Sequence, residues 1–126
     1  MKSIIINPDT KEIIEKDMPT FKDMYAEIGN QCRLVQAVTV FPNEDTLFCD
    51  EEGLFNSHEN SFIFGVGNDG DEFAEYFIIV GKGILLGADE DGETISVQGE
   101  LEYYKRRIKW NTIEQTTEYK STVFCV

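Results

Sequence analysis

The placement of negative charge constrains this 126-residue chain more than any other feature of its sequence. Residues 44–93 hold fourteen Asp and Glu but one base, Lys82, so that block carries 14 − 1 negative charges, the whole formal net charge of −13. The block contains four acidic clusters, each at turn-forming residues between apolar runs: Asn43–Asp45, Asp50–Gly53, Asn68–Glu72 and Asp89–Glu93. The pattern therefore predicts short strands joined by acidic turns whose carboxylates face solvent.

Two hairpins are predicted from the apolar runs and the turns between them. Residues 4–6 and 12–14 flank Asn7–Thr10, where proline fixes φ and the Asn and Asp side chains can bond their own backbone. Residues 33–41 are rich in β-branched side chains, and residues 46–49 return after a four-residue turn.

Four further segments are candidate strands. Residues 61–66 fit either a strand or a short buried helix, because six residues are too few for periodicity to decide. Residues 75–80 and 83–86 are near-continuous apolar runs and are predicted to be central strands, and residues 94–97 form a shorter edge strand. The ending, residues 111–126, is either a final strand or a tail.

Two helices are predicted. The first covers residues 21–28, with Thr20 as its cap, Gly29 as its stop signal and apolar side chains at helical spacing. The second covers residues 100–110 and is amphipathic and basic, with Lys105, Arg106, Arg107 and Lys109 around an apolar stripe.

These elements predict an α+β fold with a mainly antiparallel sheet of about five to seven short strands and two helices. The length is typical of one domain, and 41% hydrophobic residues are enough for a core, so residues 1–126 are expected to form a single domain.

Composition also excludes several partners and compartments. A net charge of −13 argues against direct binding to nucleic acid, because phosphate contacts need a basic face. No stretch approaches the length of a membrane-spanning helix or a signal peptide, so no membrane partner is expected. Cys32, Cys49 and Cys125 form an odd, unpatterned set that favours reduced thiols and a cytoplasmic location.

No catalytic or metal constellation stands out. Cys49 and His58 could pair across a turn, but a third orienting group is missing. Residues 89–93 fail the EF-hand pattern in either register, and the cysteines and the single histidine lack zinc spacing. We therefore expect no enzymatic activity, no catalytic residues, no cofactor and no metal site.

The acidic turns are the candidate partner-binding surface, and their alternative role is solubility. Carboxylates on rigid turns can imitate spaced phosphates and attract a nucleic-acid-binding protein. The candidate residues are Glu44, Asp45, Asp50, Glu51, Glu52, Asp69, Asp71, Glu72, Asp89 and Asp91.

Three segments resemble a family of small uncharacterised domains found in phages, plasmids and other mobile elements. Residues 28–36 are similar to its helix-end segment, residues 48–56 with Asn60 to its aromatic-x-DEEG signature, and residues 77–81 to its following strand. The sequence departs from the pattern at Asn30, where a second glycine is usual. The resemblance covers roughly residues 1–90, which gives a family-like core over 1–94 and an extension over 95–126.

The resemblance implies a genomic context rather than a chemistry. It favours a non-enzymatic acidic module, in a bacterial host cell, that binds a basic host protein and inhibits a host defence or nucleic-acid-binding protein. Two alternatives stay open. One is a small-molecule or metal-binding protein with a site near Asp50, His58 and Asn60. The other is a structural component, such as a homodimer, that associates through its apolar strands and residues 122–126.

Overall fold

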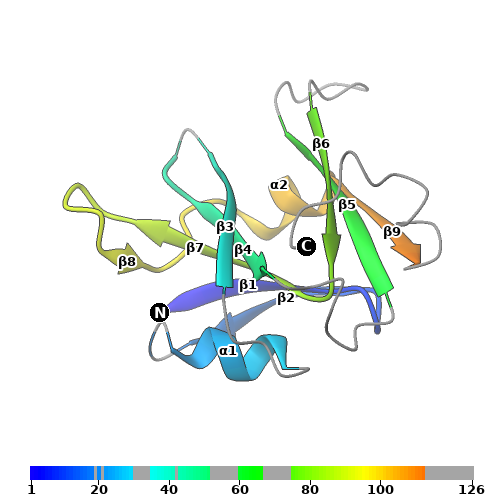
Figure 1. The fold of residues 1–126 in the computed structure, drawn as a ribbon. Helices are drawn as coiled ribbons and strands as arrows, with labels where there is room; N and C mark the ends of the chain where they lie inside the picture. The colour runs from blue at the N-terminus through cyan, green and yellow to red at the C-terminus, as the bar shows by residue number, and fades with distance from the viewer. Residues whose placement is uncertain are drawn as a thin grey trace.

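A computed structural model describes residues 1–18, 20, 22–29, 35–41, 43–51, 60–66 and 75–112. Within these residues the chain forms nine strands and two short helices, drawn in Figure 1. The elements are β1 (Lys2–Asn7), β2 (Glu12–Asp17), α1 (Asp23–Ile28), β3 (Val35–Val40), β4 (Thr46–Asp50), β5 (Asn60–Val66), β6 (Glu75–Val80), β7 (Gly83–Ala88), β8 (Thr94–Ile95), α2 (Leu101–Lys105) and β9 (Ile108–Thr112). The predicted α+β class is confirmed, although the strands outnumber the five to seven expected.

The strands form two antiparallel sheets. Sheet A has the order β2-β1-β7-β4-β3, with β8 paired to β7, and sheet B has the order β6-β5-β9. Both predicted hairpins are confirmed as β1–β2 and β3–β4, and residues 61–66 are a strand rather than a helix.

The two apolar runs predicted as central strands have different places. β7 is central, because it pairs with β1, β4 and β8, whereas β6 lies at an edge of sheet B within the described residues. Only Gly81 and Lys82 join these two strands. Gly81 has a φ of +82°, which glycine adopts without steric cost, and this turn sends the chain from one sheet to the other. An apolar run indicates that a strand is buried, but it does not indicate how many other strands pair with it.

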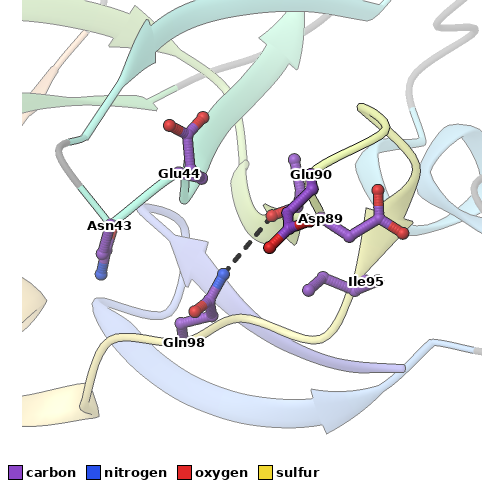
Figure 2. Close-up of a pocket in the computed structure, with 7 residues that line it drawn as sticks. Asn43, Glu44, Asp89, Glu90, Ile95 and Gln98 are labelled. Carbon is purple, nitrogen blue, oxygen red and sulfur yellow. Dashed lines mark hydrogen bonds between the residues drawn. The ribbon is translucent and has the colours of Figure 1, made fainter.

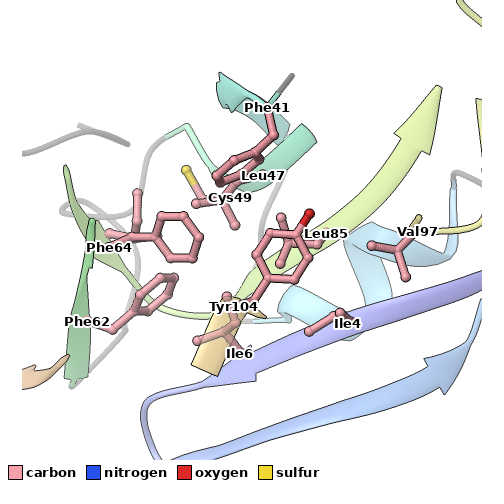
Figure 3. Packing of buried hydrophobic residues seen from close by; sticks show 11 residues of the cluster. Ile4, Ile6, Phe41, Leu47, Cys49, Phe62, Phe64, Leu85, Val97 and Tyr104 are labelled. Atoms are coloured by element: carbon pink, nitrogen blue, oxygen red, sulfur yellow. The ribbon is translucent and has the colours of Figure 1, made fainter. Parts of the chain in front are cut away.

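The inner strands β1 and β7 of sheet A are buried on both faces, so their successive side chains enter two different cores. On one face Ile4, Ile6 and Leu85 join Phe62 and Phe64 of sheet B, so the larger core lies between the two sheets (Figure 3). On the other face Ile5, Ile84 and Leu86 pack with Met24 and Ile28 of α1. We call these the inter-sheet core and the helix-side core.

α1 begins at residue 23, and its predicted cap is wrong in one respect. Thr20 does not cap the helix; instead its backbone N–H and its hydroxyl each donate to the Asp23 carboxylate at 2.8 Å. Gly29 ends the helix as predicted, and its N–H donates to the Tyr25 carbonyl.

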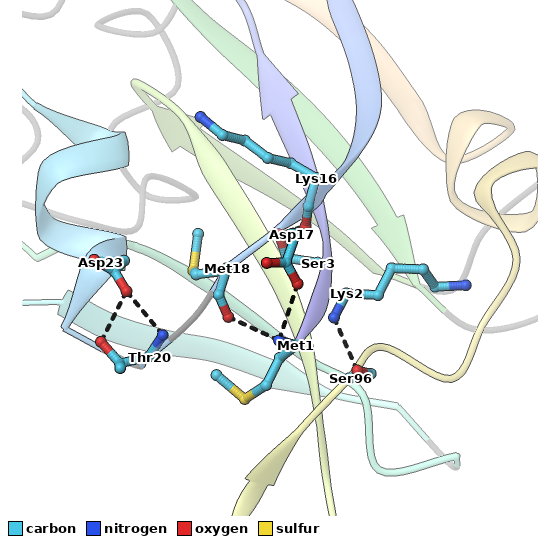
Figure 4. Close-up of polar contacts among 9 residues, drawn as sticks. All are labelled: Met1, Lys2, Ser3, Lys16, Asp17, Met18, Thr20, Asp23 and Ser96. Carbon is cyan, nitrogen blue, oxygen red and sulfur yellow. Dashed lines mark hydrogen bonds and ion pairs between the residues drawn. The ribbon is translucent and has the colours of Figure 1, made fainter.

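Polar contacts at the surface fasten α1 and the start of the chain to sheet A. Lys16 Nζ lies 2.6 Å from a Glu27 carboxylate oxygen, and Lys82 Nζ donates to the Glu27 carbonyl at 3.0 Å. The Met1 ammonium donates to Asp17 and to the Met18 carbonyl (Figure 4). All of these carboxylates reach the protein surface.

The predicted helix over residues 100–110 is only half right. α2 ends at Lys105, and residues 108–112 form β9, which pairs antiparallel with β5. Two β-structure contacts favour this change: the Gly65 N–H donates to the Arg107 carbonyl at 2.8 Å, and Ile108 pairs with Phe64. Tertiary pairing with a buried strand therefore outweighs the helical spacing of the local sequence.

Candidate functional site

A buried carboxylate, Asp45, connects two parts of the chain that are distant in sequence, the β3–β4 turn and residues 98–104. It follows the β3–β4 turn and is fully buried. One carboxylate oxygen accepts the Gln98 N–H at 2.8 Å, and the other accepts the Gly99 N–H at 2.7 Å. The second oxygen also accepts the Tyr104 hydroxyl proton and the Asn43 side-chain N–H. Asp45 thus fastens the 97–99 segment and α2 to the turn.

Tyr104 forms the buried side of this network. Its ring is fully buried in the inter-sheet core and meets Phe41 edge-on, with the ring centroids 5.3 Å apart (Figure 3). Burial raises the pKa of the Tyr104 hydroxyl well above its ordinary value, and the hydrogen bond to Asp45 raises it further. The hydroxyl therefore stays a proton donor to Asp45 at every physiological pH.

The turns beside Asp45 form an open hollow at the surface. Its volume is about 500 Å³, and Glu44, Asp89 and Glu90 line it together with Asn43, Ile95 and Gln98 (Figure 2). Glu44 has a φ of +70°, an uncommon conformation for a residue with a side chain. The Asp89 carboxylate accepts the N–H groups of Asp91 and Glu93 at 2.9 Å, which fixes the shape of the second turn.

A second hollow of about 370 Å³ adjoins the first, because Asn43 and Gln98 line both. Glu100, Glu102, Tyr103 and Arg106 line it as well. We call the two hollows together the acidic groove. Five carboxylates and one cation line it, so its local charge is strongly negative.

The predicted binding residues divide into four groups, the last of which is the buried pair Asp45 and Asp50. Glu44 and Asp89 line the groove, and Asp91 is exposed in the adjacent turn. Glu51 is also exposed, but it follows the opposite end of β4. Glu52, Asp69, Asp71 and Glu72 lie outside the described residues.

The expectation that the acidic clusters face solvent is wrong for two residues. Asp45 and Asp50 are both fully buried, immediately before β4 and at its last residue. Asp45 is satisfied by the donors described above, so its carboxylate holds the fold together rather than meeting a partner. Sequence cannot reveal this role, because Gln98 and Gly99 lie more than 50 residues away.

Sequence reasoning also missed part of the groove. Glu100 and Glu102 were assigned to a basic helix, whereas they extend the acidic lining. Arg107 was predicted in the basic face of that helix, but it is buried and donates to the Gly65 carbonyl at 3.2 Å. Its guanidinium lies 4.3 Å from the centroid of the Tyr103 ring. The local sequence carries no signal for these placements, which depend on the pairing of β9 with β5.

The cysteine prediction is wrong for Cys49, which is fully buried and disulfide-bonded. An odd, unpatterned set of three cysteines carried no spacing from which a disulfide could be inferred. The other two cysteines and His58 lie outside the described residues, so the Cys49–His58 pair does too. Asn60, from the alternative ligand site, donates its side-chain N–H to Asp9 at 2.9 Å.

The described residues contain neither a metal-binding group nor a membrane-spanning helix. Within them, no group of three or more His, Cys, Asp or Glu side chains is arranged to hold a metal ion. In the same part of the chain, no helix has the length and apolar character needed to cross a membrane.

Comparison with known proteins places the chain in a family. A family model described as a domain of unknown function, DUF3846, matches residues 1–109. The chain belongs to the DUF3846 family. No curated protein and no solved structure gives a significant match to it.

The DUF3846 match includes every residue of the acidic groove, because it runs from β1 through α2 into β9. Membership of an uncharacterised family is thereby confirmed. The match reaches residue 109, whereas the sequence resemblance covers roughly residues 1–90.

Proposed function

We propose that this DUF3846 protein is a non-enzymatic binding module that engages a basic surface of another protein through the acidic groove. One observation carries the proposal. Glu44 and the Asp89–Glu90 pair come from turns more than 40 residues apart, yet they line the same hollow, which Glu100 and Glu102 continue. Convergent charge in a concave surface focuses the electrostatic field and accelerates the capture of an oppositely charged partner.

The groove suits an arginine-bearing segment in particular. Carboxylates accept paired hydrogen bonds from a guanidinium, whose planar fork matches their geometry. Tyr103 adds an aromatic ring next to the carboxylates of Glu100 and Glu102. Arginine also interacts with aromatic faces, and the Arg107–Tyr103 contact within the chain is an example.

The family resemblance gives this proposal its biological setting. We propose that the protein belongs to a phage or mobile element and acts in the cytoplasm of a bacterial host. Its partner would be a basic host protein, such as a defence or nucleic-acid-binding protein, which it inhibits. Carboxylates spaced along a groove would occupy the cationic surface that the partner uses to hold phosphates.

A charge-neutralised variant tests the proposal directly. We would carry Glu44→Gln, Asp89→Asn and Glu90→Gln together and use tagged protein to capture partners from a bacterial lysate at low and high salt. The wild type should retain one basic protein that is released at high salt, because exposed charge pairs are screened. The groove variant should not retain it.

A matched control removes the same number of charges elsewhere. Glu12→Gln, Glu15→Gln and Asp17→Asn change three exposed carboxylates on β2, and this variant should capture the partner as the wild type does. Equal loss in both variants would show that only net charge matters. Capture that neither salt nor the groove variant changes would refute the proposed site.

A further inference from the structure

The walls of the acidic groove are held by a residue that contributes nothing to its surface. Asp45 is fully buried, so a partner cannot touch its carboxylate. Nevertheless, both hollows are lined by Asn43 and Gln98, and the Asp45 carboxylate bonds to both of these residues. Its remaining partners, Gly99 and Tyr104, precede Glu100 and follow Tyr103 in the second hollow.

We infer that Asp45 is the positioning residue of the groove: its carboxylate fixes the 97–99 segment and α2 against the β3–β4 turn and so sets the spacing of the exposed carboxylates. This inference rests on the proposed function. It assigns the effect of Asp45 on binding to geometry, because Asp45 itself cannot meet the partner.

The carboxylate is specifically required, because both of its oxygens accept backbone N–H groups. An asparagine at this position would keep the size of the side chain, but its amide group would turn a donor toward Gln98 or Gly99. One part-buried backbone N–H would then lose its acceptor, and the 97–99 segment would move to satisfy it.

Close packing transmits such a movement to the groove. A Cβ added at Gly99 would lie 2.6 Å from the Tyr104 ring, so this segment has no free space on that side. A Cβ at Gly87 of β7 would lie 2.5 Å from the carbonyl oxygen of Ser96, which leads into the segment, and 3.2 Å from the Asp45 carboxylate. The segment is therefore seated between α2 and β7, and Glu100 follows it directly.

The test compares three variants by fluorescence anisotropy with a labelled nona-arginine peptide as the probe, at low salt and below the thermal transition of every variant. Asp45→Asn changes no exposed charge, yet we expect it to weaken binding by about fivefold or more. Tyr104→Phe keeps both backbone bonds and removes only the bond to α2, so it should weaken binding less than Asp45→Asn does. Gly99→Ala moves the same wall without altering any charge, so it should weaken binding even if Asp45→Asn fails to fold.

A double-mutant cycle separates positioning from a general loss of stability. If Asp45 acts through the groove carboxylates, adding Glu90→Gln to Asp45→Asn should weaken binding less than Glu90→Gln does in the wild type. Hydrogen exchange at the Gln98 and Gly99 amides should accelerate in Asp45→Asn while β1 and β2 stay protected.

The outcomes distinguish this inference from the function on which it rests. Full probe binding by the triple groove variant of Glu44, Asp89 and Glu90 would overturn the proposed function. Weak binding by that variant, with undiminished binding by Asp45→Asn and Gly99→Ala, would overturn the positioning role alone. The positioning role would also be overturned if the binding losses of Asp45→Asn and Glu90→Gln were additive and each variant lost binding only in proportion to its loss of stability.

Discussion

The two faces of sheet A are covered in different ways. The inter-sheet core joins two sheets and ends at a buried carboxylate with four donors around it. The helix-side core is smaller, and a six-residue helix covers it with ion pairs at its rim. Carboxylates act on both faces, but Asp45 is fully buried, whereas Glu27 at the rim of the helix side is 16% exposed and pairs with the half-exposed Lys16.

The difference shows that burial decides how much a carboxylate contributes. Removing a buried acceptor lowers stability strongly, because its donors have already lost their water and are left without a hydrogen-bond partner. The charges of an ion pair at the surface stay hydrated whether or not the pair forms, so the pair contributes little to stability, and salt screens its attraction. The groove end of the molecule should therefore be rigid, whereas α1 should open more easily.

The largest expected effect is at the buried carboxylate. Asp45→Asn should lower the free energy of unfolding by about 3 kcal/mol, because a part-buried backbone N–H loses its acceptor and the other hydrogen bonds lose their charged partner. Urea unfolding under non-reducing conditions, followed by circular dichroism, measures this value. A loss below that of an exposed ion pair would contradict the contrast between the two faces.

Packing on the helix side gives the next effect. Met24 is fully buried between α1 and sheet A, and Met24→Ala should cost about 2 kcal/mol through lost contacts and a residual cavity. Hydrogen exchange should accelerate in α1 and leave the Gln98 and Gly99 amides unchanged. Faster exchange at those amides would show that the two faces do not behave separately.

The tyrosine hydroxyl offers a pH-dependent test of the same network. Tyr104→Phe should cost about 1–2 kcal/mol near neutral pH, because Asp45 loses one donor but keeps its backbone bonds. The pKa of Tyr104 is raised in the folded state, so its stabilisation is present below the unfolded value near 10 and is lost as the pH rises above it. The stability difference between wild type and variant should therefore narrow above about pH 10, and a constant difference would contradict the assigned bond.

The smallest effect belongs to the rim of the helix side. Lys16→Ala removes the ion pair with Glu27, which Lys82 also contacts, and should change stability by less than about 1 kcal/mol. The change should shrink further in high salt, where the two variants can be compared by the same urea titration. A cost near that of Asp45→Asn would remove the distinction drawn above.

The sequence correctly predicted those features of the fold that depend on residues close together along the chain. Apolar runs and turn residues were enough for the two hairpins, the end of α1 at Gly29 and the α+β class. They failed where a distant strand decides the outcome, as in residues 108–112, which pair with β5 instead of extending α2.

The candidate site was predictable to a similar extent. Charge and turn residues identified Glu44 and Asp89, because solvated carboxylates on turns follow from the sequence alone. The same reasoning wrongly predicted Asp45 on the surface, because the sequence around it gives no indication of its donors, Gln98 and Gly99. Neighbouring acids in one turn thus separate into a groove residue and a buried acceptor, and only the three-dimensional contacts distinguish them.

The positions of Asp45 and Asp50 have a consequence for strand registration. They are the fully buried carboxylates immediately before β4 and at its last residue, and β4 lies between β3 and β7. A slip of one residue along either neighbour would turn Leu47 and Cys49 to the opposite face and carry Asp45 away from its donors. The bonds of Asp45 therefore favour a single alignment of β4, and misaligned pairings are penalised during folding.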